Sequence, residues 1–425
     1  MKKSSYMPRL IDNVVERRLS VFGAVCIEGP KWCGKTWTSL EHSNSSYFVG
    51  DPDNNFRNRL LAEINPSKIL IGKYPRLIDE WQEVPSLWDA VRFEVDKTSE
   101  KGKFILTGSS TPPTKGVLHS GAGRIDKIRM RPMTLFESNE SCGSVSLSAL
   151  FNKEFKTEIA KEKNDLEKLI HYVVRGGWPG SLNLEKEDSY LIPKSYINSL
   201  LTDEVLSFDG IKRSTSKIRA LLRSLARNES TLASNRTIVK DIKEMDDESV
   251  STESLRTYVD ILERMFILEN QNSFAPNIKS KARVAKSAKR HLVDPSLAVA
   301  LLNLTPKMLY ENLDYFGFLF ESLVYRDLNI YSEVNDYKTF HFRNLSNNEE
   351  IDIIVQTKEG DYGAFEVKLG LNQIDEAAKG LIGFKNSFEN QKDKPKILGI
   401  ICGVCDIAYK REDGVFVIPI NMLKP

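Results

Sequence analysis

The segment GPKWCGKT at residues 29–36 constrains the fold of this chain more than any other. It follows a short apolar run, FGAVCIE (22–28), and it fits the pattern G-x-x-x-x-G-K-[ST]. In this pattern backbone N–H groups wrap a phosphate, and the second glycine lets the backbone approach the anion closely. A strand that leads into such a loop and then into a helix predicts an α/β sheet with a P-loop that binds nucleotide phosphate.

The loop and two later positions supply the predicted ATP-binding residues. Lys35 would reach the β- and γ-phosphates, and the Thr36 hydroxyl would coordinate Mg²⁺. A second strand-like run, PRLIDE (75–80), ends in Asp79 and Glu80, at the edge where α/β sheets bind ligands. Asp79 would hold the Mg²⁺, and Glu80 would orient or deprotonate the attacking water. The alternative is an exposed Asp-Glu pair after a strand. The predicted ATP set is Gly29, Pro30, Lys31, Trp32, Cys33, Gly34, Lys35, Thr36, Asp79 and Ser109.

Two further segments extend this half of the chain. The strand-like run KFILTGSS (103–110) is expected to lie between the other two strands, where Thr107 or Ser109 could contact the γ-phosphate or the water. The alternative is a simple turn. The segment HSGAGRIDKIRMRPM (119–133) contains Arg124, which could stabilise charge on the γ-phosphate in its own chain or in a neighbouring copy of a homo-oligomer. The alternative for Arg124 is a strand residue paired with surface acids.

Together these motifs resemble a bacterial and archaeal group of AAA-type ATPases. Members of the group end in a domain of unknown function whose core is similar to restriction-endonuclease-like nucleases. The resemblance covers nearly the whole chain and implies a protein that binds ATP and Mg²⁺ and hydrolyses the nucleotide. The segments that carry it are IEGPKWCGKT (27–36), RLIDEWQ (76–82), RFEVD (92–96), FILTGS (104–109) and GAGRI (121–125).

Changes in composition and in the spacing of apolar residues along the sequence predict an α/β multidomain chain with four parts. They are an AAA-type P-loop core (1–135), a helical lid or connector (136–212), a winged helix-turn-helix with a basic stretch (213–293) and a restriction-endonuclease-like domain (294–425). In the connector, GGWPG (176–180) interrupts a helix. Trp178 is expected to pack at a domain junction rather than to contact a ligand.

The third part has the order of a winged helix. Apolar residues recur at helical spacing in SKIRALLRSLARN (216–228) and in SVSTESLRTYVDILERMFIL (249–268), with a short helix expected between them. The last of these helices would offer Ser254, Arg256 and Thr257 to a DNA major groove. A basic stretch that could contact DNA phosphates follows, comprising Lys279, Lys281, Arg283, Lys286, Lys289 and Arg290. The alternative is a module that binds protein or packs within the chain.

The last third contains a nuclease-like pattern. A predicted helix (317–331) carries Glu321, and a strand-like run, EEIDIIVQT (349–357), carries Asp352. In a further run Glu366 and Lys368 are two residues apart, so both point to the same face of a strand. In this pattern Asp352 and Glu366 would hold Mg²⁺, Lys368 would orient or activate water, and Glu321 could complete the metal shell. The alternative is a fold that is kept for binding without catalysis.

Composition limits the remaining functions. Lys and Arg total 60 against 58 acidic residues, so a DNA-binding surface must be a local patch. No apolar run has the length of a membrane helix and no signal peptide is recognised, which predicts a cytoplasmic protein without membrane contact. The five cysteines are too few and scattered for a disulfide framework, and Cys402 and Cys405 are expected to pack in the core.

The sequence therefore predicts an ATPase that couples its nucleotide state to DNA binding and could also cleave DNA with Mg²⁺. The alternative is a nucleotide-dependent switch or scaffold that binds a protein partner and has an inactive nuclease-like domain.

Overall fold

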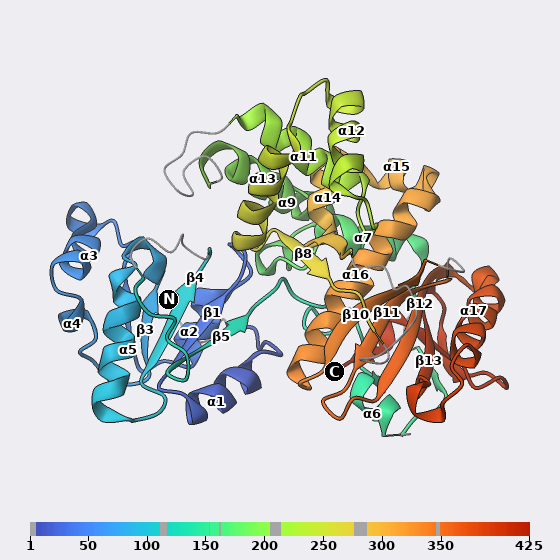
Figure 1. Ribbon diagram of the computed structural model, residues 1–425, viewed down its shortest axis with the longest axis horizontal. Helices are drawn as coiled ribbons and strands as arrows, with labels where there is room; N and C mark the ends of the chain where they lie inside the picture. Colours follow the sequence, from blue (N-terminus) through green and yellow to red (C-terminus); the bar gives the residue numbers. More distant parts are fainter. Residues whose placement is uncertain are drawn as a thin grey trace. The chain divides into compact units, whose positions relative to one another are not determined.

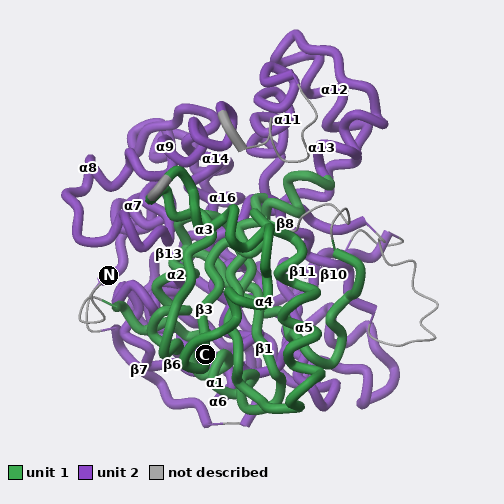
Figure 2. Tube along the Cα trace, turned by 90° about the vertical axis from the view of Figure 1, so that its left-hand side faces the viewer, with its two compact units in different colours: residues 1–132, 204–212, 260–267 green, residues 133–203, 213–259, 268–425 purple. Residues whose placement is uncertain are grey.

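The computed structural model describes residues 6–110, 117–152, 154–160, 163–204, 214–275, 287–345 and 349–425. Contacts within the chain divide it into two compact units (Figure 2). Unit 1 comprises residues 1–132, 204–212 and 260–267, and unit 2 comprises residues 133–203, 213–259 and 268–425. The P-loop motif belongs to unit 1, and the predicted nuclease-like residues belong to unit 2.

Unit 1 is built on a sheet of five parallel strands (Figure 1). These are β1 (Ala24–Glu28), β2 (Ser45–Phe48), β3 (Arg76–Asp79), β4 (Phe104–Gly108) and β5 (Ile125–Arg129), in the order β2-β3-β4-β1-β5. β4 lies between β1 and β3, which confirms the predicted place of residues 103–110. The helices of this part are α1 (Asp12–Val21), α2 (Lys35–Glu41), α3 (Asp53–Ile64), α4 (Pro66–Ile69), α5 (Ser86–Thr98) and the short η2 (Trp81–Glu83).

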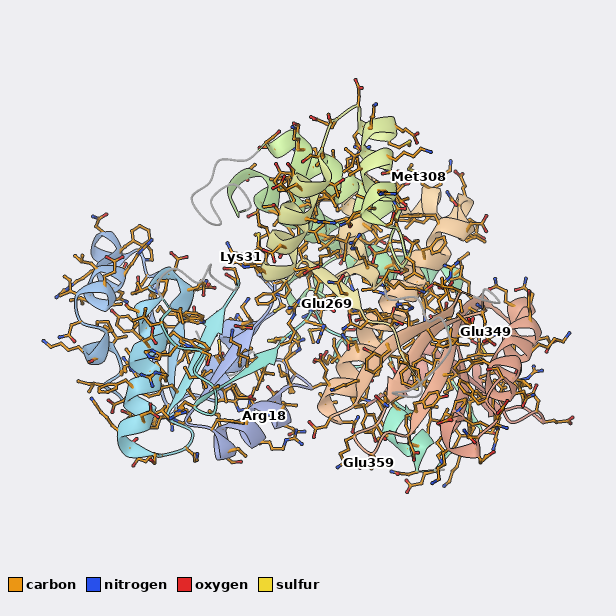
Figure 3. All side chains as sticks on the ribbon, in the orientation of Figure 1. Arg18, Lys31, Glu269, Met308, Glu349 and Glu359 are labelled. Carbon is orange, nitrogen blue, oxygen red and sulfur yellow. The ribbon has the colours of Figure 1, made fainter. Side chains whose placement is uncertain are left out.

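The two faces of this sheet are covered by different apolar clusters. Every residue of β1 and β4 is buried, as expected for central strands of a parallel sheet. Ala24 and Cys26 belong to a cluster with Trp88 of α5, whereas Val25 and Ile27 belong to a cluster with α1. Side chains therefore fill both faces (Figure 3), and the carboxyl edge of the sheet is left for the loops that follow the strands.

Unit 2 begins with helices and two short strand pairs. Its helices before the large sheet are α6 (Leu147–Phe151), α7 (Leu166–Arg175), η3 (Pro179–Ser181), α8 (Lys186–Ser189), α9 (Leu191–Ser199), η4 (Leu200–Glu204), α11 (Thr215–Arg227), α12 (Asn235–Asp246), α13 (Thr252–Arg264), α14 (Pro295–Leu301), α15 (Pro306–Glu311) and α16 (Leu313–Val334). η4 and α13 each end in residues that belong to unit 1. β8 (Leu268–Gln271) pairs antiparallel with β9 (Lys289–Leu292), and β6 (Val145–Ser146) pairs parallel with β16 (Leu423–Lys424).

A seven-stranded mixed sheet forms the rest of unit 2 (Figure 1). Its order is β10-β11-β12-β13-β15-β14-β7. The strands are β7 (Glu158–Ile159), β10 (Lys338–Asn344), β11 (Glu349–Gln356), β12 (Tyr362–Gly370), β13 (Ile397–Val404), β14 (Ile407–Lys410) and β15 (Phe416–Pro419), with η5 (Leu371–Gln373), α17 (Ile374–Asn386), η6 (Gln391–Asp393) and η7 (Ile420–Met422) between or after them. β12, β13 and β15 run parallel, and β10 and β11 are antiparallel neighbours.

Helices cover both faces of this larger sheet. Cys402 and Cys405 lie in an apolar cluster with residues of α17, which confirms that the two thiols pack in the core. A side chain at the neighbouring Gly403 would instead meet Phe320 of α16 and Leu169 of α7. Alternate residues of β13 thus face different helices, as the pleat of a strand requires.

Trp178 is fully buried within unit 2. Its indole N–H donates to the Ser296 hydroxyl at 3.0 Å, and its ring stacks on Tyr196 with centroids 4.7 Å apart. These contacts give Trp178 a packing role within unit 2. Among the described residues, no helix is both long enough and apolar enough to cross a membrane.

Candidate functional site

The P-loop connects β1 to α2 in unit 1. Gly34 has a φ of 105°, a conformation that favours glycine, and α2 begins at the next residue. A Cβ at Gly29 would lie 2.0 Å from the Met130 carbonyl oxygen, so only glycine fits there. The Lys35 ammonium donates to the Pro30 carbonyl at 2.8 Å and is buried. The predicted order of strand, loop and helix is therefore present.

Other contacts fix the remainder of the loop. The buried Cys33 thiol lies 3.7 Å from the Met130 carbonyl, while Lys31 (Figure 3) and Trp32 are partly or largely exposed. The buried Arg9 guanidinium donates to the carbonyls of Cys33 at 2.7 Å and Arg131 at 2.9 Å. Sequence reasoning missed Arg9, because nothing in its local sequence connects it to a loop more than twenty residues away.

Asp79 lies beside the end of the loop. Its Oδ1 accepts hydrogen bonds from the Thr36 hydroxyl at 2.9 Å and from the Thr107 hydroxyl at 2.7 Å. Burial raises the pKa of Asp79, while these two hydrogen bonds act in the opposite direction. The pairing of a threonine hydroxyl with a carboxylate fits the oxygen ligands that Mg²⁺ takes next to nucleotide phosphates. The structure thus brings together the residues that the sequence predicted for this metal.

Glu80 follows the end of β3 and has a φ of 57°, which is uncommon for a residue with a side chain. Its backbone N–H donates to the Thr107 hydroxyl at 2.9 Å, and its carboxylate accepts from the Ser109 hydroxyl at 3.0 Å. The Gln82 amide donates to the same carboxylate and, at 3.2 Å, to Ser109. Gln82 was not predicted as a site residue, although its position two residues after Glu80 was the available signal.

Arg124 lies at the other edge of the sheet. β5 runs parallel to β1, and its register pairs Ala24 with Ile125, so Arg124 comes before the strand rather than after it. Its guanidinium is half exposed and pairs with Asp96 at 2.7 Å. A contact with the γ-phosphate of the same chain does not fit this placement, because the P-loop follows the opposite ends of the strands. The observed contact matches the alternative of an arginine paired with a surface acid, and a role in a neighbouring copy stays a prediction.

In unit 2 the sheet brings the predicted nuclease-like residues together. Lys368 pairs with Glu366 at 2.7 Å, and its ammonium lies 3.9 Å from Asp352 Oδ2. That same oxygen accepts from the Val367 N–H at 2.9 Å. Burial raises the pKa of Glu366 to about 8. Glu366 and Lys368 therefore lie on the same face of β12, as predicted. Glu321 of α16 contacts this cluster through a further residue, Lys289.

Lys289 was predicted to be part of a DNA-binding stripe, and this prediction is wrong. Only 1% of the residue is exposed, and its ammonium lies 2.7 Å from Glu321 and 3.2 Å from Glu350. Arg290 donates to Asn235 at 2.7 Å and to the Ala233 carbonyl at 3.3 Å. The other predicted members of the stripe lie outside the described residues; they are Lys279, Lys281, Arg283 and Lys286.

The carboxylates of this cluster are accompanied by cations. In the described part of the chain, no three His, Cys, Asp or Glu side chains are grouped so that they could hold a metal ion. The cations among these carboxylates are Lys289 and Lys368. Burial raises the pKa of Glu321 to about 7, and Lys289 opposes that rise. Mg²⁺ bound by Asp352 and Glu366 stays a prediction.

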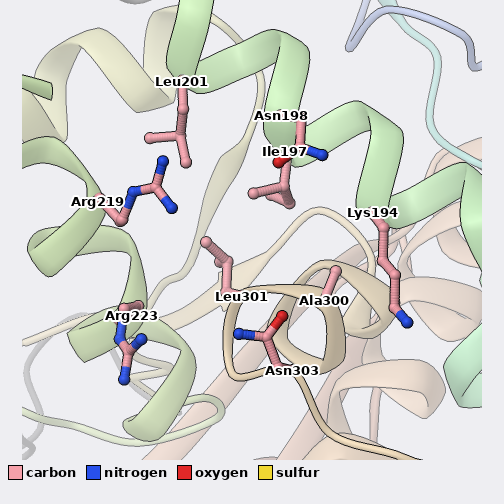
Figure 4. A pocket seen from close by; sticks show the side chains of 9 residues that line it. All are labelled: Lys194, Ile197, Asn198, Leu201, Arg219, Arg223, Ala300, Leu301 and Asn303. Carbon is pink, nitrogen blue, oxygen red and sulfur yellow. The ribbon is translucent and has the colours of Figure 1, made fainter.

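Residues 214–275 contain the three predicted helices, α11, α12 and α13, and the β8–β9 pair follows them in the described part of the chain. Thr231, between α11 and α12, forms a bridge with Arg290 of β9. On α13, Arg256 and Thr257 are exposed and Ser254 is half-buried. A hollow of about 160 Å³ lies nearby in unit 2 (Figure 4), with three basic and no acidic side chains in its lining. It is lined by Lys194, Ile197, Asn198, Leu201, Arg219, Arg223, Ala300, Leu301 and Asn303.

Comparison with known proteins assigns the first part of the chain. Residues 22–139 match the family model of an AAA domain. This segment contains the whole five-stranded sheet with its P-loop, and this α/β P-loop fold supports nucleotide binding. Residues 166–308 match a domain of unknown function, DUF8612, and residues 316–423 match another, DUF4143. These descriptions give no activity to either segment of unit 2.

Relatives of known sequence and structure are distant. The uncharacterised proteins Mb2031c of Mycobacterium bovis and Rv2008c of Mycobacterium tuberculosis are each 24% identical over 358 residues, which covers 83% of this chain and 72% of theirs. The Walker-type ATPase PABY2304 of Pyrococcus abyssi is 13% identical, with a TM-score of 0.44, and the alignment covers 71% of this chain and 97% of that one. AMPPCP-bound DnaA from Aquifex aeolicus is 13% identical with a TM-score of 0.26, over 60% of this chain and 86% of that one. At these scores neither structure adds to the assignment.

Proposed function

We propose that unit 1 binds ATP with Mg²⁺ and hydrolyses it. The observation that carries this proposal is the convergence of two hydroxyl groups on one carboxylate beside the P-loop: Thr36 and Thr107 both donate to Asp79 Oδ1. A P-loop threonine and a strand-end aspartate are the pair that holds Mg²⁺ in P-loop ATPases. The match of residues 22–139 to the family model of an AAA domain also supports ATP binding by unit 1.

The loop would bind the phosphates. The Lys35 ammonium donates to the neutral Pro30 carbonyl and could exchange it for charged oxygens of the β- and γ-phosphates. The first turn of α2 would direct its backbone N–H groups at the same anion. Thr36 and Asp79 would hold Mg²⁺, which supplies positive charge to the phosphate oxygens when it is bound.

Glu80 would act on the water. Its carboxylate is oriented by Ser109 and Gln82, so that it could position a water molecule and accept its proton. The Thr107 hydroxyl contacts both Asp79 and the Glu80 backbone, and it would thereby link the metal-binding carboxylate to the proposed base. We therefore expect Glu80 to act in hydrolysis more than in ATP binding.

Phosphate release by purified variants tests the ATPase proposal. Lys35→Ala should lower the rate on the order of 100-fold or more, as expected when a group that stabilises transition-state charge is removed. Glu80→Gln should abolish turnover while ATP binding, measured with a fluorescent analogue, is retained. The matched control is Lys101→Ala, because Lys101 is exposed in the same unit. An unchanged rate in Lys35→Ala would refute the proposal.

We further propose that the nucleotide state controls DNA binding through residues 214–292. Supporting observations are the order of α11, α12, α13 and the β8–β9 pair, the bridge between Thr231 and Arg290, and the exposed Arg256 and Thr257. These features suit a winged helix whose third helix enters a major groove. The basic hollow lined by Lys194, Arg219 and Arg223 would add phosphate contacts.

DNA cleavage is not part of this proposal, because Lys289 lies among the carboxylates that a catalytic metal would need. The same observation favours the second candidate function, a nucleotide-dependent switch whose unit 2 binds a protein partner without chemistry. The two candidates differ in their response to salt, because phosphate contacts weaken steeply as the salt concentration rises.

Fluorescence anisotropy with a labelled DNA duplex distinguishes the candidates. We expect salt-dependent binding whose affinity changes when a non-hydrolysable ATP analogue is added. Arg256→Ala should weaken binding and lower the salt slope by about 1 if Arg256 contacts a phosphate. Lys240→Ala, which changes an exposed cation on α12, is the control. No measurable affinity at low salt would favour the protein-binding switch.

A further inference from the structure

Lys289 is a buried cation surrounded by carboxylates. Its ammonium lies 2.7 Å from Glu321 Oε1, 3.2 Å from Glu350 Oε1 and 3.9 Å from Asp352 Oδ1. These acids come from α16 and β11, and the lysine comes from β9. A buried charge is tolerated only when it is paired and hydrogen-bonded, and here each partner satisfies the other.

The β8–β9 pair holds Lys289 in this position through contacts on the edge of the large sheet. The Gln271 side chain donates to the carbonyls of Phe340 and Asp352, both at 2.9 Å. His291, two residues after Lys289 on the same face of β9, has its Nε2 3.0 Å from the side-chain amide oxygen Oε1 of Gln271. His341 of β10 contacts the Ser287 carbonyl at 3.0 Å. The register that buries Lys289 is therefore fixed from several sides.

Three cations lie beside the four carboxylates of the cluster and compensate most of their charge. Its four carboxylates are Glu321, Glu350, Asp352 and Glu366, and the cations beside them are Lys289, Lys368 and Arg343, which lies 3.4 Å from Glu350. A divalent ion bound between Glu321 and Asp352 would meet the Lys289 ammonium at close range. A divalent ion and an ammonium group that lie close together repel each other strongly in a low-dielectric environment.

We propose that Lys289 is the resident cation of this cluster, and that its ammonium takes the position a divalent metal would need. The nuclease-like residues of unit 2 then form an ion network that anchors the β8–β9 pair to the sheet, and this network does not bind Mg²⁺. The proposal is independent of ATP hydrolysis, because every residue in it belongs to unit 2.

Direct measurement of Mn²⁺ binding to the full-length chain tests this proposal. All proteins carry Asp79→Asn, so that the proposed metal site of unit 1 does not contribute, and binding is followed by calorimetry and by the loss of the free Mn²⁺ signal in electron paramagnetic resonance. Lys289→Met removes the charge and keeps much of the volume. We expect it to bind one equivalent of Mn²⁺ at least tenfold more tightly than the parent and to gain thermal stability with Mn²⁺. Adding Asp352→Asn to Lys289→Met should remove this binding.

Two comparisons keep the test decisive. Lys289→Arg retains the positive charge and should bind no more Mn²⁺ than the parent. If Lys289→Met does not fold, the parent and its Asp352→Asn variant decide: equal Mn²⁺ titrations support the proposal. A parent that binds Mn²⁺ and loses it with Asp352→Asn overturns the proposal, as does a folded Lys289→Met variant that binds none.

Discussion

Replacing Thr107 by valine tests how the proposed ATPase centre is held together. The Thr107 side chain is fully buried. Its hydroxyl donates to Asp79 at 2.7 Å and accepts from the Glu80 N–H at 2.9 Å. Valine has nearly the same shape and lacks the hydroxyl, so the substitution removes both hydrogen bonds and leaves the packing almost unchanged.

The expected cost follows from these two contacts. A hydrogen bond to a charged group contributes about 1.5–3 kcal/mol, and a buried N–H that loses its partner costs about 1–3 kcal/mol. We therefore expect Thr107→Val to lower the free energy of unfolding by about 3 kcal/mol. Thr107→Ser keeps the hydroxyl and loses one methyl group, which costs about 1 kcal/mol. The loss of the hydrogen bond should also let burial raise the pKa of Asp79 further, and this would weaken Mg²⁺ binding.

Urea unfolding followed by tryptophan fluorescence measures this difference, because Trp32, Trp37, Trp81 and Trp88 all lie in unit 1 and only Trp178 lies elsewhere. ATP turnover at increasing Mg²⁺ concentration gives the functional effect, with a higher Mg²⁺ requirement expected for Thr107→Val than for Thr107→Ser. The reasoning is refuted if the free energies of unfolding of the two variants differ by less than about 1 kcal/mol. The two hydrogen bonds of the Thr107 hydroxyl would then contribute far less than assumed.

Two predictions concern unit 2. Burial raises the pKa of Glu229 from 4.5 to about 8, so its contribution to stability is complete below pH 4.5 and is lost as the pH rises towards 8. Glu229→Gln does not ionise and should gain stability relative to the wild type between pH 5 and pH 9, by up to about 5 kcal/mol; parallel urea-unfolding profiles across this range would contradict the prediction. Trp178→Phe loses the hydrogen bond to Ser296 and part of the ring that stacks on Tyr196, and it should lower the free energy of unfolding by about 2–3 kcal/mol. Circular dichroism during urea unfolding measures this change, and a variant as stable as the wild type would show that these contacts contribute little.

The P-loop half could be predicted because its signals are local. The loop spacing places Lys35 and Thr36 at the start of α2. In a parallel sheet the end of the strand that carries Asp79 lies at the same edge as the P-loop. The place of Arg124 could not be predicted in this way, because only the register of β5 against β1 decides at which edge of the sheet this residue lies. For Gln82 the position two residues after Glu80 was the only signal, because its contact with Glu80 depends on the turn after β3.

Lys289 shows a further limit of sequence reasoning. In a run of lysines and arginines without acids, each cation is expected to face solvent. The structure instead pairs β9 with β8, and the alternation of a strand sends Lys289 and His291 inward and Arg290 outward. The partners of Lys289 lie 32 to 63 residues further along the chain, so no local pattern identifies them.

The strand pairs at the margins of unit 2 have a consequence for synthesis of the chain on the ribosome. β6 pairs with β16, and β7 pairs with β14. These strand pairs can therefore form only after residues 407–424 have been synthesised. The five strands of unit 1 all lie between residues 24 and 129 and can associate much earlier. We expect the five-stranded sheet of unit 1 to form during translation, whereas the strand pairs of unit 2 form only after translation has nearly finished, and their long-range pairing makes that step the slower one.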